Sequence, residues 1–155
     1  MLDSIRRLFD FATSGLAVSQ ELLRLARTRK GKSKLLLEEL KENQDLCTMV
    51  VNEHTDPMKT IPALRTEHYD ALLAEGFDFG SLKKEKIRSR PVLQKSDLAP
   101  FASKGTGVLV EDIYDKIKEI ERRYRLDRDN PKTDWRRRMI NVYKRIILLI
   151  DHLRD

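Results

Sequence analysis

Apolar residues in the last part of the chain recur at the alternating three- and four-residue spacing of one helix face. Between Pro131 and Leu153 they fall at Trp135, Met139, Val142, Ile146, Leu149 and Leu153. This face is widened to about half of the helix circumference by Ile140, Tyr143, Ile147 and Ile150. Asn130 can cap the free N–H groups, and proline suits the first helical position. The pattern predicts a helix over residues 131–153 that contacts two or more others, at or near the centre of a helical bundle.

Three further segments show helical periodicity and predict helices over residues 3–29, 34–54 and 108–126. Only a short basic turn separates the first two, which indicates an antiparallel hairpin. Gly15 marks either a weak point in the first helix or a close helix crossing. The residues that we expect to be buried on the four apolar faces are Leu16, Leu23, Leu40, Cys47, Ile113, Ile117, Ile120, Trp135, Met139 and Ile146.

Residues 55–107 differ from the rest of the chain, because they hold four of the five prolines and four of the six glycines. Within them we expect one short helix near residues 63–75, with Thr60 as its cap and Gly76 as its stop. The apolar residues in the rest of this segment have no regular spacing. We expect it to be an irregular crossover that packs over the helical bundle. The sequence therefore predicts an all-α fold in a single domain, residues 1–155. Its architecture is a four-helix bundle built from two antiparallel helical hairpins, joined by a long, partly helical crossover.

Charged residues make up 36% of the 155 residues, hydrophobic residues 40% and aromatic residues only 6%. This composition is typical of exposed helical surfaces rather than of sheets. The net charge of +6 allows nucleic acid, anionic lipid or an acidic protein as a partner, but does not choose among them.

Basic residues gather in four clusters, at residues 27–34, 83–90, 122–125 and 136–138. If these clusters line a nucleic-acid path, the contacts come from Arg27, Arg29, Lys30, Lys32, Lys34, Lys83, Lys84, Lys86, Arg88, Arg90, Arg136, Arg137 and Arg138. No recognition-helix motif and no row of exposed aromatic residues accompanies them. The alternative interpretation is that they are solvated helix ends, since cations near a helix C-terminus are favourable.

Arg138, Arg145 and His152 share one edge of the apolar face of the last helix, at intervals of seven residues. A positive edge with a histidine can bind a phosphate and move a proton. Arg145 and His152 resemble the Arg-x(4–6)-His pattern of the HEPN family of helical ribonucleases, a resemblance that covers eight residues. That family often has a polar residue directly after the arginine, where this chain has Ile146. The resemblance implies RNA cleavage by this pair, and the alternative is a rim of side chains that reach past the helix boundary to water.

Other kinds of chemistry find little support in the sequence. The one cysteine, Cys47, rules out an internal disulfide, and we expect it to be a reduced core residue. We expect no metal site and no cofactor, because the three histidines lie in different elements and no Gly-rich phosphate loop is present. Asn43 and His54 lie on an apolar face, where polar side chains usually fix helix register and are satisfied internally.

The expected location is the cytoplasm, because no apolar run approaches the ~20 residues of a membrane span and the N-terminus does not resemble a secretory signal. For the function we expect a non-enzymatic helical-bundle module for protein–protein interaction, with self-association as one form of it. The alternatives are a basic nucleic-acid-binding protein and, third, a HEPN-like ribonuclease. The expected partner is a protein or a second copy, with nucleic acid as the alternative and a membrane not expected.

Overall fold

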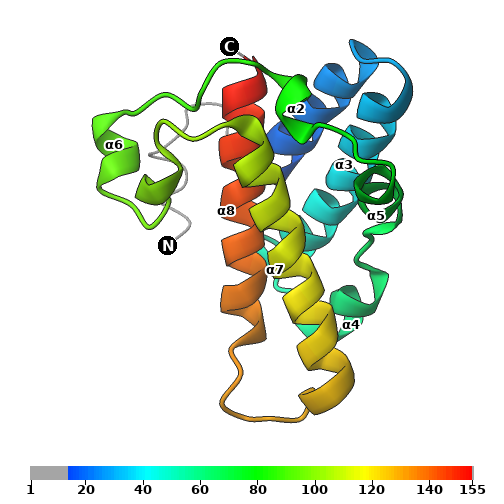
Figure 1. Ribbon diagram of the computed structural model, residues 1–155. Helices are drawn as coiled ribbons and strands as arrows, with labels where there is room; N and C mark the ends of the chain where they lie inside the picture. Colours follow the sequence, from blue (N-terminus) through cyan, green and yellow to red (C-terminus); the bar gives the residue numbers. More distant parts are fainter. Residues whose placement is uncertain (1–13, 155) are drawn as a thin grey trace.

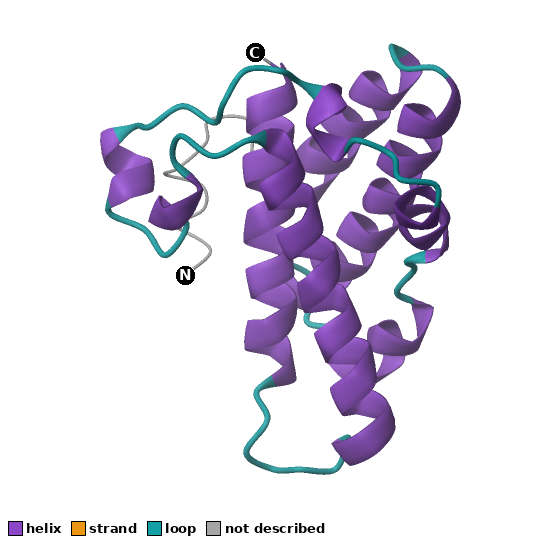
Figure 2. Cartoon of the chain, in the orientation of Figure 1, coloured by secondary structure: helices purple, strands orange, loops and turns teal. Residues whose placement is uncertain are grey.

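The computed structural model describes residues 14–154, which are all-helical and contain no strand (Figures 1 and 2). The helices in chain order are α2 (Gly15–Arg27), α3 (Gly31–Val51), α4 (Pro57–Thr60), α5 (Glu67–Ala74), α6 (Pro91–Gln94), α7 (Thr106–Asp127) and α8 (Trp135–Arg154). The 3₁₀ turns are η1 (Ile61–Ala63), η2 (Phe79–Leu82) and η3 (Ala99–Phe101). The all-α prediction is confirmed, and the part of the first predicted helix before residue 14 lies outside the described residues.

Helix α8 contacts α2, α3, α4 and α7. Every residue from Ile146 to Leu153 is buried, so the wide apolar face is used inside the molecule. The prediction that this helix contacts two or more others is confirmed. Figure 1 shows α7 and α8 side by side, joined by the loop at the bottom of the view.

The predicted bounds of three helices are wrong. Helix α3 covers residues 31–51 rather than 34–54. Helix α8 begins at Trp135 rather than at residue 131, because Asp134 provides the cap: its Oδ1 accepts a hydrogen bond of 3.0 Å from the Arg137 N–H. The short helix predicted near 63–75 is interrupted, since Leu64 adopts an extended ψ of 143° after η1. Helix α5 therefore covers only residues 67–74 of that range.

The predicted core is confirmed on three helices and wrong on α2. The buried predicted residues are Leu40, Cys47, Ile113, Ile117, Ile120, Met139 and Ile146. Leu16 is 69% exposed, while Leu23 and Trp135 are partly exposed. The reason lies at Gly15, where an added Cβ would come within 2.0 Å of the Thr48 side chain. Because α2 crosses α3 this closely at Gly15, its buried face runs through Val18 and Leu22 instead.

Two buried polar side chains of α3 hold the start of the crossover. The Asn43 amide donates to the Arg65 carbonyl at 2.7 Å and accepts from the Arg65 N–H at 2.8 Å. One turn earlier, the Glu39 carboxylate accepts the His68 N–H at 2.7 Å and the Tyr69 N–H at 3.1 Å. Glu39 is only 1% exposed, and it caps α5 from another helix.

Asn43 is therefore satisfied internally, as expected. The expectation for His54 is wrong: it lies beyond the end of α3, is exposed and has a φ of 57°.

Stacked aromatic rings connect α5 to α7 and η2. The Tyr69 ring lies 4.1 Å from the Tyr114 ring and 5.0 Å from the Phe79 ring, measured between centroids. Burial raises the pKa of Tyr69 to about 12. Burial, followed by the nearby Glu39 carboxylate, also raises the pKa of Tyr114 well above its usual value.

Replacing Glu39 should destabilise the fold, because two N–H groups at the start of α5 would lose their acceptor. We expect Glu39→Ala to lower the free energy of unfolding by about 1–3 kcal/mol, measured by urea denaturation. The neighbouring, partly exposed Glu38 provides the control, and Glu38→Ala should change it by less than about 0.5 kcal/mol. Equal losses in both variants would contradict the capping role.

Candidate functional site

Three of the four basic clusters lie beside an end of α8: cluster 83–90 at its C-terminal end, and clusters 122–125 and 136–138 at its N-terminal end. Cluster 27–34 reaches the start of cluster 83–90 through the Arg29 guanidinium, which donates to the Leu82 carbonyl at 2.7 Å, but none of its residues lines the cavity at the C-terminus of α8. Clusters 122–125 and 136–138 meet near the N-terminus of α8, where Arg123 and Arg137 line one hollow. The sequence separation between clusters 27–34 and 83–90 is long, so their contact depends on the path of the crossover.

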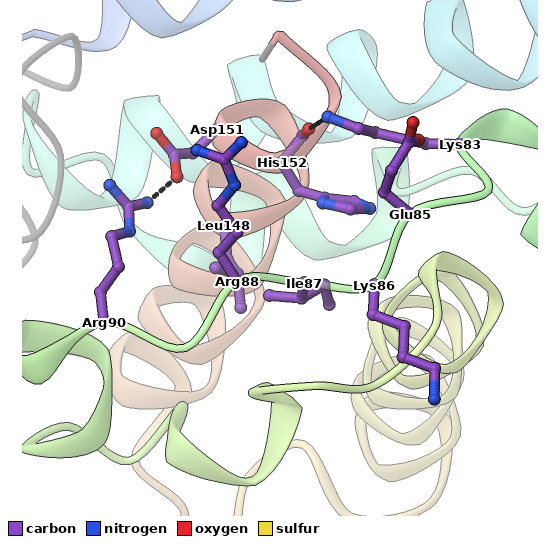
Figure 3. Close-up of a pocket in the computed structure, with 9 residues that line it drawn as sticks. All are labelled: Lys83, Glu85, Lys86, Ile87, Arg88, Arg90, Leu148, Asp151 and His152. Carbon is purple, nitrogen blue, oxygen red and sulfur yellow. Dashed lines mark hydrogen bonds and ion pairs between the residues drawn. The ribbon is translucent and has the colours of Figure 1, made fainter.

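The C-terminal cavity, as we call the first of these sites, has a volume of about 150 Å³ (Figure 3). Its lining residues are Lys83, Glu85, Lys86, Ile87, Arg88, Arg90, Leu148, Asp151 and His152. Ile87 fixes this segment by two backbone hydrogen bonds, accepting from the Ser103 N–H at 2.8 Å and donating to the Lys104 carbonyl at 2.9 Å. The middle of the basic segment is therefore held against the loop that precedes α7.

A buried hydrogen-bond network ties this segment to α7 and α8. The Thr106 hydroxyl lies 2.8 Å from the Lys83 carbonyl and 2.8 Å from His152 Nε2, and the Lys83 ammonium donates to the His152 carbonyl at 2.7 Å. The single hydroxyl hydrogen must go to the carbonyl, which only accepts. His152 Nε2 therefore carries a hydrogen and donates it to Thr106.

Positive side chains approach the end of α8 from both sides of the cavity. Figure 3 shows Arg88 and Arg90 pointing toward α8, Lys83 reaching it from the other side, and Lys86 pointing away. Arg90 forms an ion pair with Asp151, which is 4% exposed. Cations at a helix C-terminus are favourable, so part of this charge serves the fold. With Glu85 and Asp151 present, the cavity has charges of both signs.

The second site, which we call the α7–α8 hollow, has a volume of about 430 Å³. Its lining residues are Arg123, Asn130, Lys132, Thr133, Asp134, Arg137, Arg138 and Asn141. Glu119 Oε1 accepts from both Arg123 Nε and Arg138 Nη1 at 3.3 Å. Partial burial opposes ionisation of Glu119, but the hydrogen bonds from Arg123 and then Arg138 outweigh it and lower its pKa.

Arg145 and His152, the pair that resembles the HEPN motif, have different partners. Arg145 Nε donates to Asp112 at 2.6 Å, and its Nη1 donates to the Asn141 carbonyl at 3.0 Å. His152 is bonded to Thr106 in the C-terminal cavity instead. The arrangement gives the two side chains separate structural partners and does not favour a joint catalytic role.

The remaining predicted nucleic-acid contacts are distributed over the surface. Arg136 donates to the Val51 carbonyl at 3.2 Å, away from its neighbours in the hollow. Lys32 forms an ion pair with Glu75. The side chains that are simply exposed are Arg27, Lys30, Lys34 and Lys84. The basic clusters therefore lie on separate parts of the surface: cluster 83–90 lines the C-terminal cavity, and clusters 122–125 and 136–138 contribute residues to the α7–α8 hollow.

Sequence reasoning missed Asp151, a buried polar residue that lines the C-terminal cavity, and Thr106, a buried residue that is hydrogen-bonded to His152 beside it. Thr106 lies in a Gly-Thr-Gly stretch that is too short for a phosphate loop, and Asp151 occupies a charged position within an apolar face. Asp151 is the stronger signal, because a charge on the buried side of a helix needs a partner. Lys132 of the hollow was also missed, and a single lysine in a turn carries no signal.

Other sites offer less. Cys47 is fully buried, and burial raises the pKa of its thiol from 9.0 to about 12, so it is not an activated nucleophile. Over residues 14–154 no three His, Cys, Asp or Glu side chains gather to hold a metal ion. The described helices include none with both the length and the apolar character to cross a bilayer.

No protein-family model matches the chain, and no curated protein or solved structure shows significant similarity to it.

The thiol of Cys47 should react slowly with DTNB in the folded protein. At pH 8 a pKa of about 12 leaves about one thiol in ten thousand ionised, against about one in ten at a pKa of 9.0. We expect native labelling to be at least about a hundredfold slower than labelling in guanidinium chloride, and to speed up as the pH rises. Glutathione is the control, and fast native labelling would show that Cys47 is accessible.

Removal of the Thr106 hydroxyl should break the network at the C-terminal cavity. We expect Thr106→Val to lower the free energy of unfolding by about 1–3 kcal/mol in urea, because the Lys83 carbonyl and the His152 N–H lose a partner. Thr106→Ser keeps the hydroxyl and should lose less. A Thr106→Val variant as stable as the unmodified protein would contradict this role of the hydroxyl.

Proposed function

We propose that this chain is a non-enzymatic helical-bundle module that binds a protein partner through an acidic segment of that partner. The observation that carries the proposal is the set of cations that cluster 83–90 places around the C-terminal cavity, with cluster 27–34 reaching the start of this segment through the hydrogen bond of Arg29 to Leu82. The proposed architecture is the four-helix bundle of two antiparallel hairpins in a single cytoplasmic domain. Contacts of α2 with α3, of α7 with α8, and of α8 with both α2 and α3 support it.

Charge rather than apolar surface supports this mode of binding. The wide apolar face of α8 is already buried within the molecule. Among residues 14–154, the large apolar side chains that remain exposed are spread over five helices, α2, α3, α5, α6 and α7. They are Leu16, Leu35, Met49, Leu73, Val92, Val108 and Leu126. Scattered exposed apolar residues are normal on a protein surface. Recognition at the basic end is therefore proposed to be electrostatic.

The mixed signs in the C-terminal cavity favour a protein partner there. Glu85 and Asp151 lie among Lys83, Arg88 and Arg90, so a continuous run of phosphates would meet carboxylates as well as cations. A peptide can alternate acidic and basic side chains to match such a pattern. Electrostatic complementarity of this kind gives specificity and speeds association.

The proposal is testable with a labelled Asp/Glu-rich peptide and fluorescence anisotropy. Arg88 points toward the end of α8, whereas Lys86 of the same segment points away (Figure 3). We expect Arg88→Glu to weaken peptide binding by about tenfold or more, because it reverses a charge that faces the cavity. The matched control Lys86→Glu makes the same charge change and should weaken binding by no more than about threefold at physiological salt.

Two results would contradict the proposal. Equal effects of Arg88→Glu and Lys86→Glu would mean that only net charge matters. RNA that competes at this end as well as the acidic peptide does would favour the nucleic-acid alternative. If sedimentation shows a dimer of the unliganded protein that Arg88→Glu dissociates, the partner is a second copy of this chain, as the self-association form of the hypothesis expects.

A further inference from the structure

Most of the charged side chains that line the α7–α8 hollow are positive. Arg123, Lys132, Arg137 and Arg138 line it, and Asp134 is its only carboxylate among the lining residues. The Asp134 side chain is engaged as the cap of α8 through the Arg137 N–H. This balance differs from that of the C-terminal cavity, where acids and bases alternate.

Helix-end electrostatics does not account for this charge. Arg137 and Arg138 lie in the first turn of α8, where the positive end of the helix dipole disfavours cations. Arg123 on α7 and Arg138 on α8 are brought together by Glu119, whose one oxygen accepts from both at 3.3 Å. A single carboxylate offsets only one of the two guanidinium charges, so the hollow keeps a surplus of positive charge.

Arg123 and Arg138 each have further N–H donors besides the one that binds Glu119. Each donates to Glu119 through a single nitrogen, Nε in Arg123 and Nη1 in Arg138. A guanidinium carries five N–H donors in a planar fork that matches phosphate oxygens. The Asn141 amide adds a neutral donor to the same wall, whereas the Asn130 amide donates to Asp127 at 2.8 Å within the loop.

We propose that the α7–α8 hollow binds the phosphate backbone of a nucleic acid. The open volume of about 430 Å³ and the cations from two helices and their connecting loop suit an extended row of phosphates. No aromatic residue lines the hollow, so the contacts are to the backbone rather than to stacked bases. This site lies at the opposite end of α8 from the proposed protein-binding cavity and does not depend on it.

Adjacent arginines supply a matched pair of variants for the test. Arg137 lines the hollow, whereas Arg136 is directed to the Val51 carbonyl of α3. With a labelled single-stranded RNA of about 20 nucleotides, we expect Arg137→Ala to weaken binding about tenfold and to reduce the slope of log K against log salt by about one. Arg136→Ala should change the affinity less than about twofold. A duplex DNA of similar length should give the same order of variants, because the contacts are to the backbone.

Lys132→Ala is the second variant, since it changes the loop and leaves the start of α8 intact; it too should weaken binding. Both variants should keep the native circular dichroism spectrum.

The proposal is overturned if the unmodified protein binds neither RNA nor DNA at low salt, or if Arg136→Ala matches Arg137→Ala. It is also overturned if an acidic peptide displaces RNA from the hollow at equal concentration, which would assign this end to a protein partner as well. Arg88→Glu should leave RNA binding intact, which separates this test from that of the proposed function.

Discussion

A buried carboxylate on α3 determines where the crossover segment lies. Glu39 is 1% exposed, and its two oxygens accept the first N–H groups of α5. A charge removed from water is tolerated only where it is paired or hydrogen-bonded. If the crossover slid along α3, the buried Glu39 carboxylate would lose its hydrogen-bond donors, and the fold would be destabilised. Asn43 lies one turn further along the same face. Its side-chain N–H donates to the Arg65 carbonyl, and its side-chain oxygen accepts from the Arg65 N–H. Together these two side chains fix the register of the segment against α3.

The position of the crossover on α3 also determines where the basic segment 83–90 lies. Once α5 is fixed, Tyr69 stacks on Tyr114 of α7 and on Phe79 of η2. Helix η2 then approaches the start of α7 so closely that a Cβ on Gly107 would lie 3.2 Å from the Gly80 nitrogen. Directly after η2, the Lys83 carbonyl accepts from the Thr106 hydroxyl and the Lys83 ammonium donates to the His152 carbonyl near the end of α8. The position of the basic segment is thus a consequence of polar and aromatic contacts made much earlier in the crossover.

The sequence was informative wherever one helix decides the outcome by itself. The faces of α3, α7 and α8 could be predicted because each pairs a clean apolar stripe with a polar side. The face of α2 could not, since it is set by the close approach at Gly15, and periodicity within one helix does not record what the helix crosses. The start of α8 was missed for a related reason: Asn130 and Asp134 are both good caps, and the geometry of the loop selects Asp134.

The candidate sites were predictable only in their parts. His152 and the basic clusters were visible in the sequence, but their pairing was not, because the crossover has no period from which its path can be read. Arg145 illustrates the opposite error. A histidine and an arginine two helical turns apart resemble a catalytic motif, yet Asp112 on α7 takes the arginine as an ion-pair partner. Spacing along one helix does not show which side chains on neighbouring helices compete for the same group.

Lysine and arginine side chains lie at both ends of α8, but the fold explains their presence at only one of them. At the C-terminus, Lys83 and Arg90 face the negative end of the helix dipole and Asp151, so the fold itself explains why cations are there. At the N-terminus the dipole opposes Arg137 and Arg138, and Asp134 already satisfies the helix start. Charge that the local structure disfavours has to be explained by something outside the helix. Glu119 explains part of it, and an anionic partner in the α7–α8 hollow is the physical explanation that we infer for the rest.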